Sequence, residues 1–206
     1  ADSRETETPP VTEEITLTTG VMFANVVVTQ GAVVVSLAVA AWYFSIPGDA
    51  FGLAPDIWSN MRAVATETVG LGVGFGLVLW VGSELSTRVA DAVGATYDES
   101  VRTLLAPESP LEWVGLLGVV LPVIAVSEEL LFRGALIGVA ATGTGLSPWL
   151  CAVGSSIAFA LGHGAQGRVG VVVTGTLGFV LAAGYVLSAS LLLVVVAHYV
   201  INAMEF

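Results

Sequence analysis

Two adjacent glutamates and an arginine stand in one of the most apolar parts of this chain, the stretch SEELLFRG at 127–134, which follows the uncharged segment WVGLLGVVLPVIAV. Each charge placed at the middle of a bilayer costs about 3 kcal/mol, so these side chains would need pairing, protonation or internal water. Glu129 and Arg133 are four residues apart, in the favoured order for an ion pair on a helix, whereas Glu128 points about 100° away. The spacing predicts a structural Glu129–Arg133 pair and a Glu128 that faces a bundle interior. A purely structural network of all three is the alternative.

The chain has two histidines, His163 and His198, and both lie within or at the ends of apolar segments. His198 and Asn202 are four residues apart and therefore share a helix face. A lone histidine in such a place is more often a hydrogen-bonded structural residue, and His198 with Asn202 alone fits a helix–helix hydrogen bond. Together with Glu128, however, they provide polar groups from three helices that could meet in one wet cavity.

Such a cavity would contain the groups that hydrolysis of a peptide bond needs. A buried carboxylate beside an imidazole, here Glu128 and His163, can deprotonate and orient a water molecule. A second imidazole and an amide, His198 and Asn202, can donate hydrogen bonds to a developing oxyanion. The zinc motif HExxH is absent, although Glu128, His163 and His198 could in principle supply a His₂Glu zinc set. Buried acids and histidines also build proton or ion pathways or a scaffold for a partner, which is the alternative function.

The elements that would position these residues are membrane-spanning helices. Of 206 residues, 55% are hydrophobic and 11% are charged, with a mean hydropathy of +0.89, whereas soluble domains carry roughly 25% charged residues. Uncharged runs of about 18 residues or more can cross a bilayer as helices. We expect an all-α, polytopic membrane helical bundle of about six transmembrane helices with a polar intramembrane cavity. The expected helices cover about 19–44, 66–85, 111–141, 148–162, 169–186 and 190–204.

The chain divides into three parts. Residues 1–18 form an acidic, proline-bearing tail that we expect to be disordered. Residues 19–110 hold two transmembrane helices, the second rich in glycine and suited to close helix packing, and a charged loop with a surface helix. Residues 111–206 form a core of four helices that carries the polar side chains. The single cysteine, Cys151, lies in an apolar run and cannot form an internal disulfide.

Three motifs of the core resemble those of a known family. EELLFR at 128–133 fits EExxxR, FALGH at 159–163 fits FxxxH, and HYVIN at 198–202 fits HxxxN. In order and spacing they are similar to the CPBP family of intramembrane proteases, also called the ABI family, which includes CAAX-type prenyl-protein endopeptidases and bacteriocin-processing proteins. The resemblance covers about 112–206, and residues 1–110 match only as generic membrane helices.

The resemblance implies a role for each motif position. Glu128 and His163 would activate the hydrolytic water, and His198 and Asn202 would form the oxyanion site. The remaining positions would support the architecture and line the site: Glu129, Arg133 and Phe159. Members of the family have been described as metal-dependent and as metal-independent. We expect no metal, because Glu128 and His163 suffice as a pair and asparagine is a poor zinc ligand; zinc held by Glu128, His163 and His198 is the alternative.

The same resemblance implies a multi-pass protein of the cell membrane whose conical cavity opens toward the cytosol. The arginines favour a cytoplasmic amino terminus, since Arg4, Arg88 and Arg102 would share one side, against Arg62. A net charge of −11 with six arginines and no lysine argues against a polybasic site for nucleic acid or anionic lipid. The expected partners are the lipid bilayer and a membrane-associated protein or peptide as substrate, with no sign of whether that substrate is prenylated.

Overall fold

The computed structural model describes residues 18–53, 64–92, 94 and 100–206. Every regular element in these ranges is helical. The expected disordered tail falls outside the described residues except for Thr18, and so do Arg4 and Arg62, which entered the prediction of topology.

The helices of the described chain follow one another in this order: α1 (Thr19–Tyr43), η1 (Gly48–Phe51), η2 (Val64–Thr68), α3 (Val69–Ala92), α4 (Ser100–Leu105), α5 (Pro110–Gly115), η3 (Leu116–Val120), α6 (Leu121–Glu129), η4 (Leu130–Val139), α7 (Ala140–Thr144), α8 (Pro148–Gly162), η5 (Gly164–Gln166), α9 (Gly167–Ser188) and α10 (Leu191–Met204). The elements η2, η3 and η4 are π-helical, and η1 and η5 are 3-10 turns. The run from α5 to α7 is one continuous helix of 35 residues.

The expected all-α membrane bundle is confirmed. Four helices of the described chain are long and apolar enough to cross a membrane, at Thr19–Tyr43, Thr66–Ala90, Pro110–Thr144 and Gly164–Ser188. Two shorter apolar helices, α8 and α10, complete the six expected segments.

The second helix is longer than expected. We predicted an end near Leu85 and a loop with a surface helix over 86–110, but α3 continues to Ala92. Among the described residues between α3 and α5, the short α4 is the only helix. An i,i+4 pair in the favoured order joins the extension to the expected part of the helix, with Arg88 Nη2 3.7 Å from Glu84 Oε2. Such pairs stabilise an exposed helix face, so the charges that suggested a loop support a helical turn instead.

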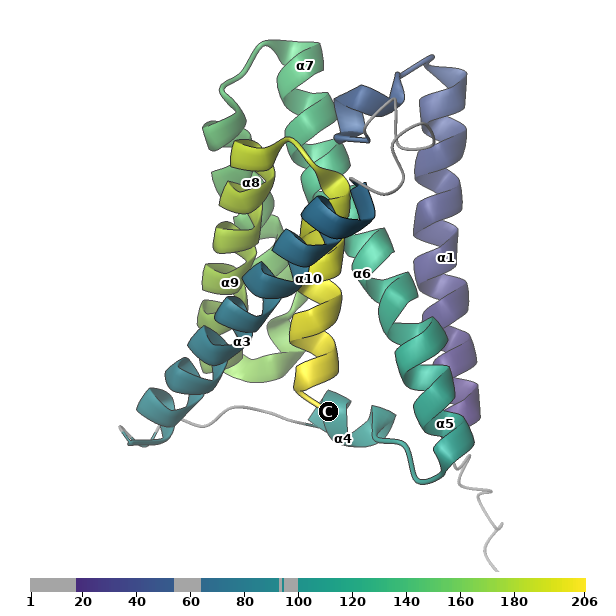
Figure 1. The fold of residues 1–206 in the computed structure, drawn as a ribbon, viewed down its shortest axis with the longest axis vertical. Coiled ribbons are helices and arrows are strands. Elements are labelled where there is room, and N and C mark those ends of the chain that lie inside the picture. The colour runs from purple at the N-terminus through teal and green to yellow at the C-terminus, as the bar shows by residue number, and fades with distance from the viewer. Residues whose placement is uncertain (1–17, 54–63, 93, 95–99) are drawn as a thin grey trace, which may run out of the picture.

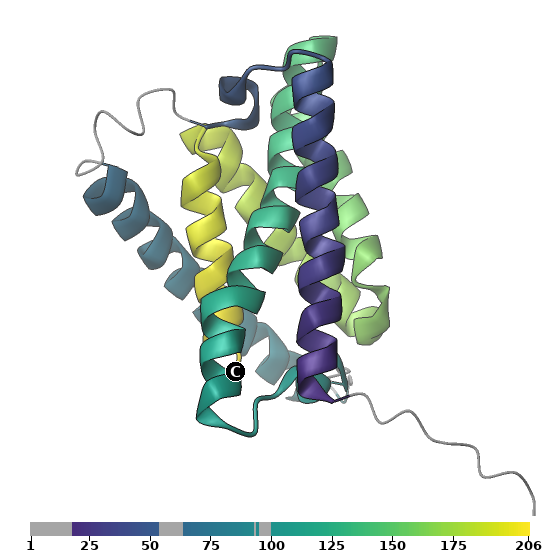
Figure 2. The same ribbon diagram turned by 90° about the vertical axis from the view of Figure 1, so that its right-hand side faces the viewer.

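The long helix α5–α7 stands beside α1, and α8, α9 and α10 follow it as antiparallel hairpins (Figures 1 and 2). Helix α10 contacts α3, α6 and α9, so it lies inside the bundle. One end of the molecule, the lower end in Figure 1, gathers the start of α1, the end of α3, α4, the start of α5 and the carboxyl terminus. Of the motif-bearing helices, α10 packs against α6, and α8 packs against η4, which continues α6.

Glycines in α3 allow it to approach α10 closely. A Cβ added at Gly76 would lie 2.7 Å from the carbonyl oxygen of Ala197, and one at Gly72 would lie 2.8 Å from atoms of α10. Gly74 lies on the opposite face, with no heavy atom within 4 Å of its Cβ position. The pair at Gly72 and Gly76 has the small-xxx-small spacing of tightly packed membrane helices.

Two hydroxyl groups bind the π-helical parts of the long helix. Tyr199 on α10 donates its hydroxyl proton to the carbonyl oxygen of Leu117 in η3, at 3.1 Å. Ser155 on α8 donates to the carbonyl oxygen of Phe132 in η4, at 2.6 Å. These bonds hold α10 on the long helix before Glu128 and Glu129, and α8 on it after them. Single π-helical turns are frequent at functional sites.

Candidate active site

The ion pair expected from the EExxxR spacing is present and fully buried. Arg133 Nη1 donates to Glu129 Oε1 at 2.7 Å, and both side chains are inaccessible to solvent. Arg133 Nη2 donates to the carbonyl oxygen of Gly178 on α9 at 2.8 Å, and the guanidinium lies 4.7 Å from the ring centre of Phe159 on α8. A Cβ at Gly178 would lie 2.8 Å from that ring, so glycine is needed for this approach. The pair therefore holds α8 and α9 against the long helix.

Glu129 also binds His198, a contact that the sequence spacing did not indicate. His198 on α10 is buried, and its Nδ1 lies 2.6 Å from Glu129 Oε1. Because Arg133 pairs with the Glu129 carboxylate, which can only accept, Nδ1 carries the proton and donates. The same carboxylate oxygen thus fixes the orientation of the imidazole and leaves Nε2 as the atom that faces other groups.

Glu128 points away from the ion pair and toward α10. Its Oε2 lies 3.7 Å from His198 Nε2, and the side chain is 15% exposed. This oxygen is buried and accepts no hydrogen bond from the described part of the chain. A gap of this length between two polar atoms is typical of a water-bridged contact. Between the described side chains of Glu128 and His163, the pair predicted to act together, there is neither a hydrogen bond nor an ion pair.

His163 caps the carboxyl end of α8. Its Nδ1 lies 2.8 Å from the carbonyl oxygen of Phe159, and since a carbonyl oxygen can only accept, Nδ1 carries the proton. The Nε2 atom of the neutral ring then keeps its lone pair. The ring centre of Phe159 lies 4.4 Å from that of His163 and 6.1 Å from that of His198, so this phenylalanine contacts His163 and lies near His198.

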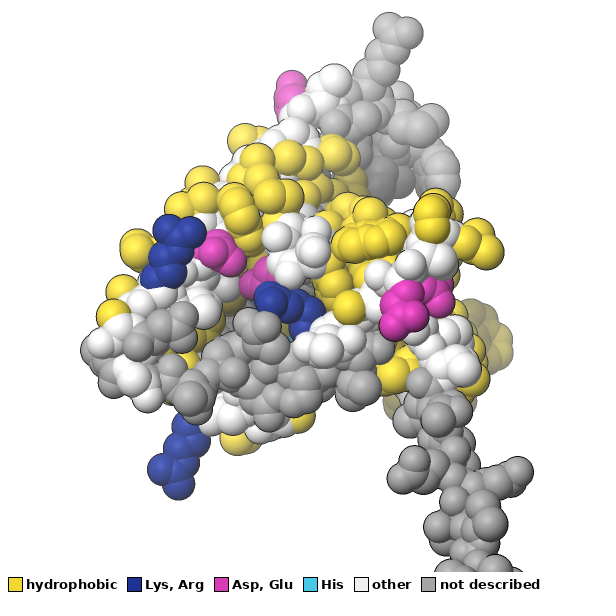
Figure 3. Space-filling view, turned by 90° about the horizontal axis from the view of Figure 1, so that it is seen from below, with side chains coloured by type: hydrophobic (Ala, Val, Ile, Leu, Met, Phe, Trp, Pro, Cys, Tyr) yellow, Lys and Arg dark blue, Asp and Glu magenta, His cyan; other side chains and the backbone are white. Residues whose placement is uncertain are grey.

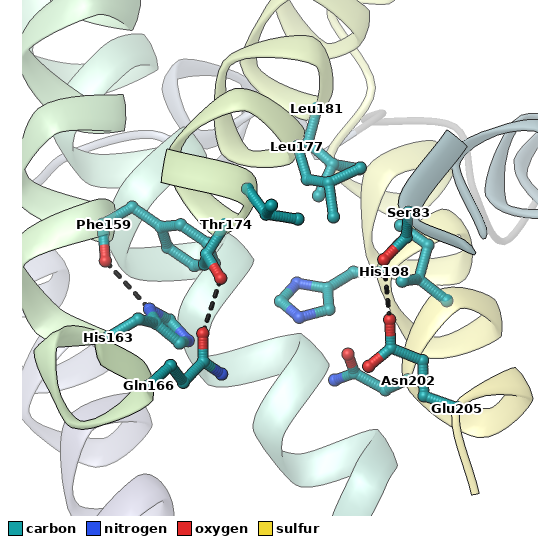
Figure 4. A pocket seen from close by; sticks show the side chains of 12 residues that line it. Ser83, Phe159, His163, Gln166, Thr174, Leu177, Leu181, His198, Asn202 and Glu205 are labelled. Atoms are coloured by element: carbon teal, nitrogen blue, oxygen red, sulfur yellow. Dashed lines mark hydrogen bonds between the residues drawn. The ribbon is translucent and has the colours of Figure 1, made fainter. Parts of the chain in front are cut away.

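The two histidines and Asn202 line one cavity of about 80 Å³ (Figure 4). Since one water needs roughly 10–15 Å³, there is space for several waters. His198 lies at the centre of the close-up, with His163 on one side and Asn202 on the other. Glu128 is not among the lining residues and approaches His198 from α6. The sequence prediction named three of the cavity's polar residues and missed four others: Ser83, Gln166, Thr174 and Glu205.

The missed residues form two hydrogen-bonded pairs at the cavity wall. Ser83 on α3 donates to Glu205 Oε1 at 3.0 Å, and Thr174 on α9 donates to Gln166 Oε1 at 2.6 Å. Gln166 is three residues after His163, and this short distance along the chain could have identified it, whereas no motif links Ser83 to the site.

Seen from the end of the molecule that holds the carboxyl terminus, charged side chains gather among hydrophobic ones (Figure 3).

The side chains do not assemble the zinc set that the sequence allowed. Among the described residues, no group of three or more His, Cys, Asp and Glu side chains could hold a metal ion. Glu128 approaches His198 but is not bonded to His163. The proposed alternative set of Glu128, His163 and His198 therefore does not fit a metal as arranged.

Residues 110–204 match the family model described as type II CAAX prenyl endopeptidase Rce1-like. The matched segment begins with α5 and ends with α10, so it contains the three motifs and most of the cavity lining. No curated protein and no solved structure gives a significant match to the chain.

Proposed function

We propose, from the match of residues 110–204 to the model of the Rce1-like type II CAAX prenyl endopeptidase family, that the chain is an intramembrane endopeptidase for a membrane-associated protein or peptide. One observation carries this proposal beyond the family match. Two imidazoles and an amide from α8 and α10 meet in one cavity, with the Glu128 carboxylate 3.7 Å from the nearer imidazole. That set contains both a base and oxyanion donors, which a proton pathway does not require.

In the proposed reaction, Glu128 is the base. Its carboxylate takes a proton from a water molecule in the cavity, and the oxygen of that water adds to the carbonyl carbon of the scissile peptide bond. His163 presents the lone pair of Nε2 to the same water and orients it. His163 lines the cavity, and Glu128 lies 3.7 Å from His198, which also lines it. Contacts to a catalytic water often tighten only when substrate is bound.

The oxyanion that forms next is stabilised from α10. The Nδ2 amide of Asn202 donates to it, and His198 donates through Nε2 when its ring is protonated. Carboxylates of Glu128 and Glu129 lie near the two nitrogens of that ring, an arrangement suited to an imidazolium. When the intermediate collapses, the C–N bond breaks, and the proton held by Glu128 passes to the leaving nitrogen. The products are a carboxylate and an amine.

The supporting residues act through the site rather than on the substrate. Glu129 and Arg133 hold His198 and α9 in place, and Phe159 fixes the ring of His163. The reaction as proposed uses no metal, so treatment with a chelator should leave the activity unchanged. Loss of activity on chelation with recovery on adding zinc would contradict this part of the proposal.

The proposal is tested by cleavage of quenched fluorescent peptides by the purified protein in liposomes. Glu128→Gln removes the base with little change of shape and should lower the rate at least about 100-fold. Glu84→Gln is the matched control, because Glu84 forms an exposed pair on α3 and does not line the cavity. Both variants should unfold at the wild-type temperature.

A folded Glu128→Gln variant that cleaves at the wild-type rate would exclude Glu128 as the base. The alternative function, a proton or ion pathway, makes a different prediction. It requires a pH-dependent flux into liposomes that Glu128→Gln abolishes, with no peptide cleaved by the wild-type protein.

A further inference from the structure

Gln166 lies in the turn that joins the two helices on one side of the cavity. His163 ends α8, and the 3-10 turn η5 brings Gln166 back toward it, with the Gln166 backbone N–H bonded to the His163 carbonyl oxygen at 3.0 Å. Gly167 then takes a φ of +76° and a ψ of −179°, a conformation that glycine alone adopts readily, and α9 begins. This local geometry fixes the position of Gln166 relative to His163.

The side-chain amide of Gln166 is also held in one orientation. Thr174, two turns into α9, donates its hydroxyl proton to Gln166 Oε1 at 2.6 Å. Because Oε1 accepts from Thr174, the Nε2 group of the same amide points in another direction. Its two N–H donors are therefore not directed at Thr174. In Figure 4 that nitrogen points away from Thr174, toward the space between Gln166 and Asn202.

We infer that Gln166 is a substrate-binding residue of this site, whose Nε2 donates a hydrogen bond to a backbone carbonyl oxygen of the peptide next to the scissile bond. The inference rests on the proposed function and adds a residue that positions the substrate. A protein backbone is the chemistry that fits, since an amide donor binds the carbonyl of any residue without selecting its side chain. The bound peptide would lie between Gln166 on one wall and Asn202 on the other.

The fixed orientation of the Gln166 amide favours binding of a substrate. A free glutamine side chain loses rotamer entropy when it binds, whereas one that is already held by Thr174 loses less. Its hydrogen bond forms equally in the bound substrate and in the transition state, because the carbonyl that it binds does not react. Its loss should therefore raise KM and leave kcat unchanged.

Four variants test this role in the cleavage assay. Gln166→Met keeps the length but has no donor, and Gln166→Glu keeps the acceptor for Thr174 but has no N–H group. Each should raise KM about tenfold and change kcat less than twofold. Thr174→Val frees the amide and should raise KM by a smaller factor, about threefold. Thr176→Val is the matched control, because Thr176 bonds to its own helix and lies outside this cavity.

A substrate change identifies the group that Gln166 binds. Replacing one backbone carbonyl near the scissile bond by a thiocarbonyl, a weaker acceptor, should raise KM for the wild-type protein at one position. The same thioamide peptide should give no further increase with Gln166→Met, since the bond is already lost. Additive effects at every position scanned would overturn the inference.

Binding without cleavage separates this inference from the proposed function. Fluorescence anisotropy of the same peptides with Glu128→Gln and with Glu128→Gln/Gln166→Met should show dissociation constants about tenfold apart. Binding that depends on Gln166 in a protein that cleaves nothing would contradict the proposed function alone. Cleavage and binding unchanged by Gln166→Met, a fall in kcat with KM unchanged, or no peptide binding at all would overturn the assignment of Gln166.

Discussion

In the proposed reaction, His163 has two separable functions, one for each of its ring nitrogens. Nδ1 donates to the Phe159 carbonyl oxygen and ends α8, while Nε2 is the atom available for chemistry. Asparagine can place its amide N–H near the position of Nδ1 but has nothing at the position of Nε2. We predict that His163→Asn keeps the wild-type unfolding temperature and loses cleavage at least about 100-fold, as measured with quenched peptides and by thermal unfolding.

His163→Ala is the comparison, since it removes both nitrogens. It should be as inactive as His163→Asn and also less stable, by about 1 kcal/mol for the lost capping bond. An active His163→Asn variant would show that the imidazole only caps the helix.

At the residue scale, the sequence predicts contacts within one helix better than contacts between helices. The Glu129–Arg133 pair follows from a spacing of four and is present. The bond from His198 to Glu129 depends on how α10 lies against α6, which no spacing encodes. For the same reason, we predicted from the sequence that Glu128 acts with His163, while in the structure the imidazole beside Glu128 is that of His198.

Helix α3 gives a prediction at the scale of one element. Gly76 is buried against α10, whereas Gly74, two residues earlier, is exposed and has open space at its Cβ position. Gly76→Ala places a methyl group 2.7 Å from a backbone oxygen, which cannot move without shifting the helix, so we predict a loss of about 1–3 kcal/mol in the free energy of unfolding. Gly74→Ala should be neutral or stabilise by up to about 1 kcal/mol, because alanine favours the helix.

Unfolding of the two variants in the same detergent measures the difference. Because Ala197 is the neighbour of His198 and lies opposite Gly76, Gly76→Ala should also slow cleavage, and Gly74→Ala should not. Equal stability of the two variants would contradict the close packing of α3 on α10.

The existence and approximate bounds of the long helices could be predicted, because long uncharged runs have one structure available to them in a membrane. The π-helical segments η3 and η4 could not. Carbonyl oxygens within them bind hydroxyls of Tyr199 and Ser155, which come from helices far along the chain. The extension of α3 to Ala92 was not predicted because we took its charged residues as a sign of a loop. Arg88 instead pairs with Glu84 along the helix.

At the scale of the whole molecule, the lengths of the helices determine where the site lies. Helices α8 and α10 have 15 and 14 residues and are about 22 and 21 Å long, shorter than the hydrocarbon core of about 30 Å. The ends of α3 and α5 extend beyond the turn that joins α8 to α9 (Figure 1). His163, at the end of the short helix α8, is therefore recessed from the ends of its longer neighbours.

Two single-cysteine variants can identify the side of the membrane on which the His163 end of α8 lies. Ser147 precedes α8 and Ala165 follows it, and both are exposed at opposite ends of that helix. The only native cysteine, Cys151, is buried, so the unmodified protein gives the background. We predict a cavity that faces the cytosol, as the family resemblance implies. A membrane-impermeant maleimide should then label Ser147→Cys in intact cells and Ala165→Cys only in inside-out vesicles. The reverse pattern would place the cavity on the outer face, and labelling of both from one side would contradict a membrane-spanning α8.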